Sequence, residues 1–119
     1  MPLYSFEGKS PRIHPAAFVA PTASIIGDVT IEENASVWYN AVVRADFSPI
    51  VIRQGANVQD CAVIHVTPVH GVEIGPGATV AHLCLIHGAD VGQVIGYAGL
   101  TAATLLGLRV VAAIGRHRK

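Results

Sequence analysis

The stretch "IHPAAFVAPTASIIGDVTIEENASVWYNAVV", residues 13–43, decides the fold because an aliphatic residue returns at every sixth position. These aliphatic residues are Ile13, Val19, Ile25, Ile31, Val37 and Val43. The fifth position of each six-residue unit is small or slender: Ala17, Ala23, Val29, Ala35 and Ala41. An uninterrupted period of six is typical of a hexapeptide repeat, in which each unit supplies one short strand and one corner of a coil.

The same register continues after two insertions. The aliphatic residue after Val43 comes three residues late, and the one after Ile64 comes four residues late. We predict loops at these points, around "FSP" at 47–49 and "TPVHG" at 67–71. The later aliphatic positions are Ile52, Val58, Ile64, Ile74, Val80 and Ile86. Six positions before the first insertion and six after it make twelve, which corresponds to four coils of three faces each.

This period predicts an all-β fold, a parallel β-helix whose neighbouring coils lie about 4.8 Å apart. A β-sandwich would instead need tight hairpin turns at regular intervals, and the chain contains no Asn-Gly or Asp-Gly pair. We expect a lead-in over residues 1–12, a β-helix domain over 13–92, and an atypical tail over 93–119.

The tail loses the register, because positions 92, 98 and 104 hold Gly, Ala and Thr. Residues 101–114 are expected either to form an apolar helix that caps the open end, or to belong to a truncated or frame-shifted end of the protein. A membrane span is not expected there, since Arg109 and several glycines interrupt an apolar stretch of marginal length.

The amino-acid composition limits the classes of molecule that we expect this chain to bind. The chain has 119 residues, of which 51% are hydrophobic, and its formal net charge is zero. Without a cationic field, nucleic acid and anionic membranes are not expected partners, so small neutral substrates or other protein chains fit better. The N-terminal stretch has no long apolar core and contains Glu7, which predicts a cytoplasmic protein without a secretory signal. We expect Cys61 and Cys84 to be buried free thiols.

The register also places the histidines. His65 and His87 each follow an aliphatic residue, and those two residues are three slots apart, so the histidines stack on adjacent coils with Arg44 one coil below. His82 follows Val80 by two residues and falls on another face, directly above Asp60. Within one chain, His82 therefore cannot meet the stacked pair.

A threefold assembly would bring the pair of one subunit against His82 of the next. Three histidines with one open position are the composition of a catalytic zinc site. Gln59 is an outward neighbour of this site, and Arg44 and Asp46 are expected to form an ion pair across the subunit interface. His70 and Glu73 are the candidates for proton transfer, whereas His14 and His117 are expected at the solvated surface.

At these residues the sequence resembles a known family. "VWYNAVVRADFSPIVIRQGANVQDCAVIHV" followed by "GATVAHLCLIHG" is similar to the core of the γ-class carbonic anhydrases and their hexapeptide-repeat homologues, and the likeness covers about residues 10–92. The resemblance implies a left-handed β-helix and a homotrimer. It also implies a zinc, iron or cobalt ion at each interface, held by His65 and His87 of one chain and His82 of its neighbour. Asn57 and Gln59 would then lie near the reacting water.

Three neutral ligands let zinc ionise water near neutral pH, which gives hydration of carbon dioxide to bicarbonate. Gln59 would orient the hydroxide, and Asp60 would hold the ring of His82. The shortened upper part of the chain predicts weak activity or none. Two alternatives stay open: a hexapeptide acyltransferase that uses a single histidine as base, and a metal-binding or assembly protein without catalysis.

Overall fold

The computed structural model describes residues 2–92, and every regular element in that range is a β-strand. The strands are β1 Leu3–Tyr4, β2 Arg12–Ile13, β3 Phe18–Val19, β4 Ser24–Ile31, β5 Ser36–Val37, β6 Val42–Ile52, β7 Asn57–Val58, β8 Val63–His65, β9 Val72–Ile74, β10 Thr79–Val80 and β11 Leu85–His87. No helix within the described range could cross a membrane. The expectations for the tail concern residues 93–119 and lie outside the described residues.

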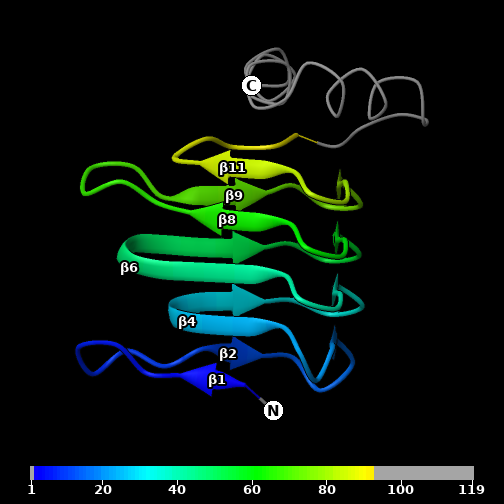
Figure 1. Cartoon of the computed structure of the whole chain (residues 1–119), viewed down its shortest axis with the longest axis horizontal. Coiled ribbons are helices and arrows are strands. Elements are labelled where there is room, and N and C mark those ends of the chain that lie inside the picture. Colours follow the sequence, from blue (N-terminus) through cyan, green and yellow to red (C-terminus); the bar gives the residue numbers. More distant parts are fainter. Residues whose placement is uncertain (1, 93–119) are drawn as a thin grey trace.

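The strands stack into a parallel β-helix, seen as rising coils in Figure 1. β4 and β6 are long because each follows two sides of the prism and bends at the corner between them. We name the three sides by their residues. The histidine face carries residues 24–26, 42–44, β8 and β11; the tryptophan face carries β3, β5, β7 and β10; the charged face carries β2, residues 29–31, residues 50–52 and β9.

The register predicted from the period of six is confirmed, since each aliphatic position lies beside the one three slots later. The pairs are Ile13 with Ile31, Val19 with Val37, Ile25 with Val43, Ile31 with Ile52, Val37 with Val58, Val43 with Ile64, Ile52 with Ile74, Val58 with Val80, and Ile64 with Ile86. Nearly all of these side chains are buried, together with the small fifth-position residues. The core is therefore a column of Ile and Val along the axis of the prism.

The two insertions behave differently. The pairing of β4 with β6 shifts between Gly27 and Val29, opposite residues 45–50, which places the extra residues where the spacing predicts them. Residues 47–49 nevertheless stay inside the continuous strand β6, so the predicted loop there was wrong. The extra residues widen the corner without ending the strand. The loop predicted at 67–71 is confirmed, and Thr67 N donates to His70 O at 2.9 Å inside it.

Two further features of the structure were not predicted from the sequence. β1, within the lead-in, pairs with β4 through Leu3 and Ile25 and so adds a strand to the histidine face. Cys84 is buried, and burial raises the pKa of its thiol, but Cys61 is exposed. The prediction that Cys61 is buried was wrong because it occupies a corner where the backbone has a positive φ of 62° and the side chain points outward.

The corner at Gly27 requires glycine for two reasons. Its φ is +81°, and a Cβ there would overlap the carbonyl oxygen of Ala45 on the next coil. We expect Gly27→Ala to destabilise the fold by more than the roughly 1–2 kcal/mol that an alanine at positive φ costs. Gly8→Ala is the matched control, because Gly8 has a φ of +78° with no atom near the added Cβ. Urea unfolding of both variants measures the difference, and equal losses would show that the contact with Ala45 does not matter.

Candidate metal centre

His65 and His87 stack on the histidine face. The two residues are register partners on β8 and β11, and their ring centroids lie 5.0 Å apart at an interplanar angle of 23°. Arg44 pairs with His65 one coil lower. The column Arg44, His65 and His87 that slot counting predicts is therefore present in the fold.

Each of these rings meets an oxygen acceptor of its own chain. His65 Nε2 lies 2.9 Å from Asp46 Oδ1, and His87 Nε2 lies 3.2 Å from the carbonyl oxygen of Val66. A carbonyl oxygen and an ionised carboxylate only accept hydrogen bonds, so Nε2 is the protonated nitrogen in both neutral rings. A neutral imidazole whose protonated nitrogen donates to a carboxylate or carbonyl is the usual state of a metal-binding histidine. In this state Nδ1 is the nitrogen of each ring that carries no proton, and it is therefore the atom that could bind a metal ion such as zinc.

Asp46 is the carboxylate of this site, and its side chain is 11% exposed. Burial alone would raise the pKa of Asp46, but the hydrogen bond from His65, a backbone hydrogen bond, the charge of His65 when its ring is protonated and the nearby charge of Arg44 together hold that pKa below its ordinary value. Arg44 Nη1 lies 3.3 Å from Asp46 Oδ2 in the same chain. The predicted pairing of Arg44 and Asp46 thus forms within one subunit, while their role between subunits stays a prediction.

His82 lies on a different corner, after β10 on the tryptophan face. Its Nδ1 is 3.3 Å from Asp60 Oδ1, and the backbone nitrogen of Leu83 donates to Asp60 O. His82 is thus above Asp60, as the register predicts. Within residues 2–92 no three His, Cys, Asp or Glu side chains converge to hold a metal ion. One described chain therefore provides the histidine pair and, elsewhere, the third candidate ligand.

Asn57 is the first residue of β7 on the tryptophan face, Gln59 directly follows the strand, and both are half-buried. Asn57 Nδ2 donates to Ser36 Oγ at 2.9 Å, while Asn57 Oδ1 is buried without a hydrogen-bond partner. Trp38 Nε1 also donates to Ser36 Oγ, at 3.0 Å. Sequence reasoning missed Ser36 and Trp38 as neighbours of the site. The register could have found Ser36, because it is the partner of Asn57 one coil lower.

The sequence also singles out three other histidines and Glu73. His14 is exposed, as expected, and its Nδ1 accepts from Ala16 N. His70 is in the loop that follows β8, near the pair, whereas Glu73 is bound to Arg53 at 2.9 Å on the charged face. His117 lies outside the described residues.

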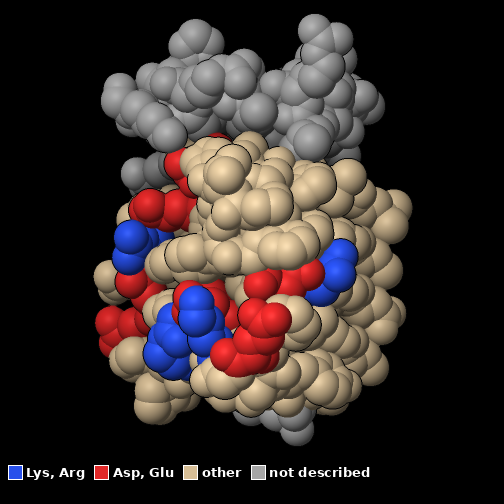
Figure 2. Space-filling model, turned by 90° about the vertical axis from the view of Figure 1, so that its left-hand side faces the viewer, with Lys and Arg blue, Asp and Glu red and all other residues tan. Residues whose placement is uncertain are grey.

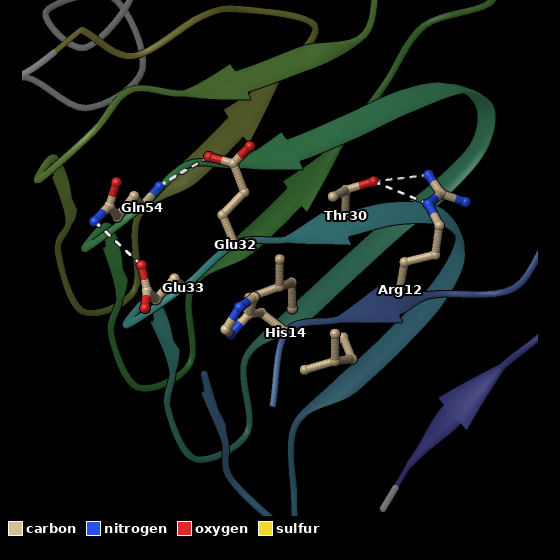
Figure 3. Close-up of a pocket in the computed structure, with 8 residues that line it drawn as sticks. Arg12, His14, Thr30, Glu32, Glu33 and Gln54 are labelled. Atoms are coloured by element: carbon tan, nitrogen blue, oxygen red, sulfur yellow. Dashed lines mark hydrogen bonds between the residues drawn. The ribbon is translucent and has the colours of Figure 1, made fainter. Parts of the chain in front are cut away.

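An open groove of about 630 Å³ runs along the charged face (Figure 3). Arg12 and Thr30 lie at one end of it, where Arg12 Nη2 donates to Thr30 Oγ1 at 2.7 Å. At the other end Glu32 accepts from Gln54 N at 3.0 Å. Hydrogen bonds join several of the polar side chains that line it, and none of the predicted metal ligands lines it, so the groove is not the candidate site.

Comparison with known proteins identifies the family to which this fold belongs. No family model matches the chain. A carbonic anhydrase of Geobacillus kaustophilus is 40% identical over 89 residues, which are 75% of this chain and 49% of that protein. The mitochondrial γ carbonic anhydrase 2 of Arabidopsis thaliana is 40% identical over 108 residues, 86% of this chain and 38% of that one. The crystal structure of a hexapeptide transferase family protein from Anaplasma phagocytophilum superposes with a TM-score of 0.72 at 40% identity, covering 76% of this chain and 52% of that one.

The coils, the register and these likenesses define a left-handed parallel β-helix of hexapeptide repeats. More particularly, the chain belongs to the hexapeptide-repeat family that includes the γ-class carbonic anhydrases. It spans about half the length, or less, of the curated relatives it matches.

The lowered pKa of Asp46 predicts how stability depends on pH. A carboxyl group whose pKa is lower in the folded than in the unfolded chain stabilises the fold above its unfolded pKa, near 3.8, and loses that effect as the pH falls through the folded value. We expect Asp46→Asn to lower the free energy of unfolding at about pH 7, and the gap to the unmodified protein to close below about pH 4. Urea unfolding at several pH values measures the gap. A gap of constant size would show that the charge of Asp46 is not responsible.

Proposed function

We propose that this chain is a subunit of a homotrimeric, metal-dependent enzyme that hydrates carbon dioxide to bicarbonate. The metal, zinc or alternatively iron or cobalt, is held by His65 and His87 of one subunit and His82 of the next. The observation that carries the proposal is the stacked pair, whose rings are both oriented by acceptors while the third histidine lies on another corner. The relatives named carbonic anhydrase support the reaction class.

The distribution of charge supports assembly through two of the three faces. Ion pairs gather on the charged face and its edges, where they involve Lys9, Arg12, Asp28, Glu32, Arg53 and Glu73. A further pair, Arg44 with Asp46, lies at the edge of the histidine face. Strands β3, β5, β7 and β10 of the tryptophan face carry no charged residue. Figure 2 shows blue and red side chains on the left and across the middle of this view, and a tan surface along its right edge.

Large apolar side chains are exposed on the charge-poor part of the prism. Those on the histidine face, the tryptophan face and the corner between them include Phe18, Trp38, Tyr39, Val63, Leu83 and Leu85. Contiguous exposed apolar residues of this size usually contact another protein. A cyclic trimer that buries the histidine face of one subunit against the tryptophan face of the next covers them and brings His82 to the pair.

In this arrangement the residues of the chain have separate tasks. His65, His87 and the neighbouring subunit's His82 would hold the zinc ion, which when bound would supply a Lewis acid that lowers the pKa of water toward neutrality. Asp46 and the carbonyl group of Val66 orient the two stacked rings, and Asp60 holds the ring of His82. Gln59 and Asn57 hydrogen-bond to the attacking water and to the bicarbonate that forms. His70, in the adjacent loop, passes the released proton to solvent.

A second candidate function has an observation of its own. The Anaplasma phagocytophilum protein is described as a hexapeptide transferase family protein, and acyl transfer in such a fold would need one histidine as general base but no metal ion. Chelation therefore separates the two functions, because it abolishes hydration but spares acyl transfer. A metal-binding assembly protein would carry metal without either activity. The cytoplasmic location stays a prediction.

Metal content tests the ligand set directly. We expect the purified protein to contain about one divalent transition-metal ion per chain, and His87→Ala to lose most of it. His14→Ala is the matched control, since His14 is an exposed histidine on another corner and its replacement leaves the metal in place. Elemental analysis together with a carbon dioxide hydration assay makes both measurements. Equal metal content in the His87 variant and the control would refute the site.

Subunit mixing tests the position of His82. His82→Ala retains the pair, and the double variant His65→Ala, His87→Ala retains only His82, so neither protein alone can build the site. Random exchange into cyclic trimers restores about one site in four for an equal mixture. We expect metal binding to return to roughly a quarter of the unmodified level, and hydration with it. Verified exchange without recovery would show that His82 does not reach the pair from a neighbouring subunit.

A further inference from the structure

Both insertions into the six-residue repeat lie at the same corner of the prism. Residues 46–49 in β6 and residues 66–71 after β8 occupy adjacent coils between the histidine face and the charged face. In Figure 1 the bend of β6 and the loop between β8 and β9 extend to the same side. We call these residues, 46–49 and 66–71, the ledge.

The two halves of the ledge are joined. Ser48 Oγ donates to Thr67 O at 2.8 Å. Gly71 packs so closely on Pro49 that a Cβ there would overlap the proline's carbonyl oxygen. The second insertion is thus built on the first, and the position of its backbone depends on the first.

Each half of the ledge supplies the acceptor for one histidine. Asp46, in the first half, accepts from His65 Nε2, and Val66, in the second half, accepts from His87 Nε2. Arg44 holds the other oxygen of Asp46, Oδ2, so that Oδ1 is presented to His65. The backbone nitrogen of Gly88 also donates to His65 O, which joins the second histidine strand to the first.

The coil below shows what this corner does without an insertion. There β4 turns the corner with only Gly27 and Asp28, and Gly27 is the register partner of Ala45 in β6. Asp28 faces the charged side, where its carboxylate binds Arg12 Nη2 at 2.7 Å and lies 3.9 Å from Lys9 Nζ. The longer corner of β6 instead presents the carboxylate of Asp46 to the histidine face.

We propose that the ledge orients the two metal-binding histidines from within their own subunit. Asp46 is the positioning residue for His65. Ser48, through Thr67, fixes the loop whose Val66 carbonyl group positions His87. This inference rests on the proposed function only in taking His65 and His87 as metal ligands. It explains why the repeat is interrupted at these two points, and it gives Asp46 a task that does not require the neighbouring subunit.

The test compares ring tautomers and zinc affinity in the full chain. Nitrogen NMR of the metal-free protein, at a pH where the rings are neutral, is expected to show His65 and His87 protonated at Nε2. Asp46→Ala should leave His65 in a mixture of tautomers and weaken zinc binding by about 10- to 100-fold. Asp28→Ala, the matched control, removes the corresponding carboxylate one coil lower and should change neither measurement.

Ser48 provides a second variant at the surface of the fold. Ser48→Ala should shift the signals of His87 and weaken zinc binding, and Ser48→Thr, which retains the hydroxyl, should restore both. Unchanged tautomers in Asp46→Ala and Ser48→Ala would overturn the inference, as would equal effects of Asp28→Ala. If the unmodified chain binds no zinc, the proposed function fails, but the tautomer measurements still decide whether the ledge orients the rings.

Discussion

The structure depends on one constraint: each strand hydrogen-bonds in parallel to the strand one coil below, with aliphatic residue beside aliphatic residue. Ile64 lies between Val43 and Ile86 in this way, and all three are completely buried. Side chains alternate between the core and the surface along each strand, so a slip of one residue would bury the histidines and expose the isoleucines. The burial of the core therefore also fixes which side chains form outward columns. The stacking of His65 on His87 is a consequence of packing Ile64 under Ile86.

Insertions are tolerated at the corners because a corner contributes little to the ladder of hydrogen bonds. The pairing of β4 with β6 is regular on both sides of the residues added in β6. Extra residues there lengthen the path around the prism and leave the core column intact. Side chains that do not obey the repeat can thus be placed beside a repeating column, and in this chain one of them, Asp46, meets the stacked histidines.

Most of the ion pairs lie on one face of the prism, and the candidate ligands lie on the other faces and their corners. The charged face is held by ion pairs between adjacent coils, for example Arg53 with both Glu32 and Glu73. Such exposed pairs add little stability individually, but they are compatible with a surface that stays in water. The other two faces carry exposed aromatic and aliphatic residues and the candidate ligands. A single described chain has a stacked pair on one face and His82 on another corner, and this separation is the reason for proposing an assembly.

The coil, its register and its columns follow from the amino-acid sequence, because a period of six counted along the chain translates directly into position on the prism once the strands pair in parallel. This is why Arg44, His65 and His87, and likewise Asp60 and His82, could be placed before any coordinates were known. The non-repeating residues, in contrast, took positions that could be known only from the folded chain. Residues 47–49 remained in a strand, Cys61 turned outward, and Asp46 reached His65 within its own chain. The physical reason is that an insertion has no period. Its path is set by how Ser48, Pro49, Thr67 and Gly71 pack against one another across two coils.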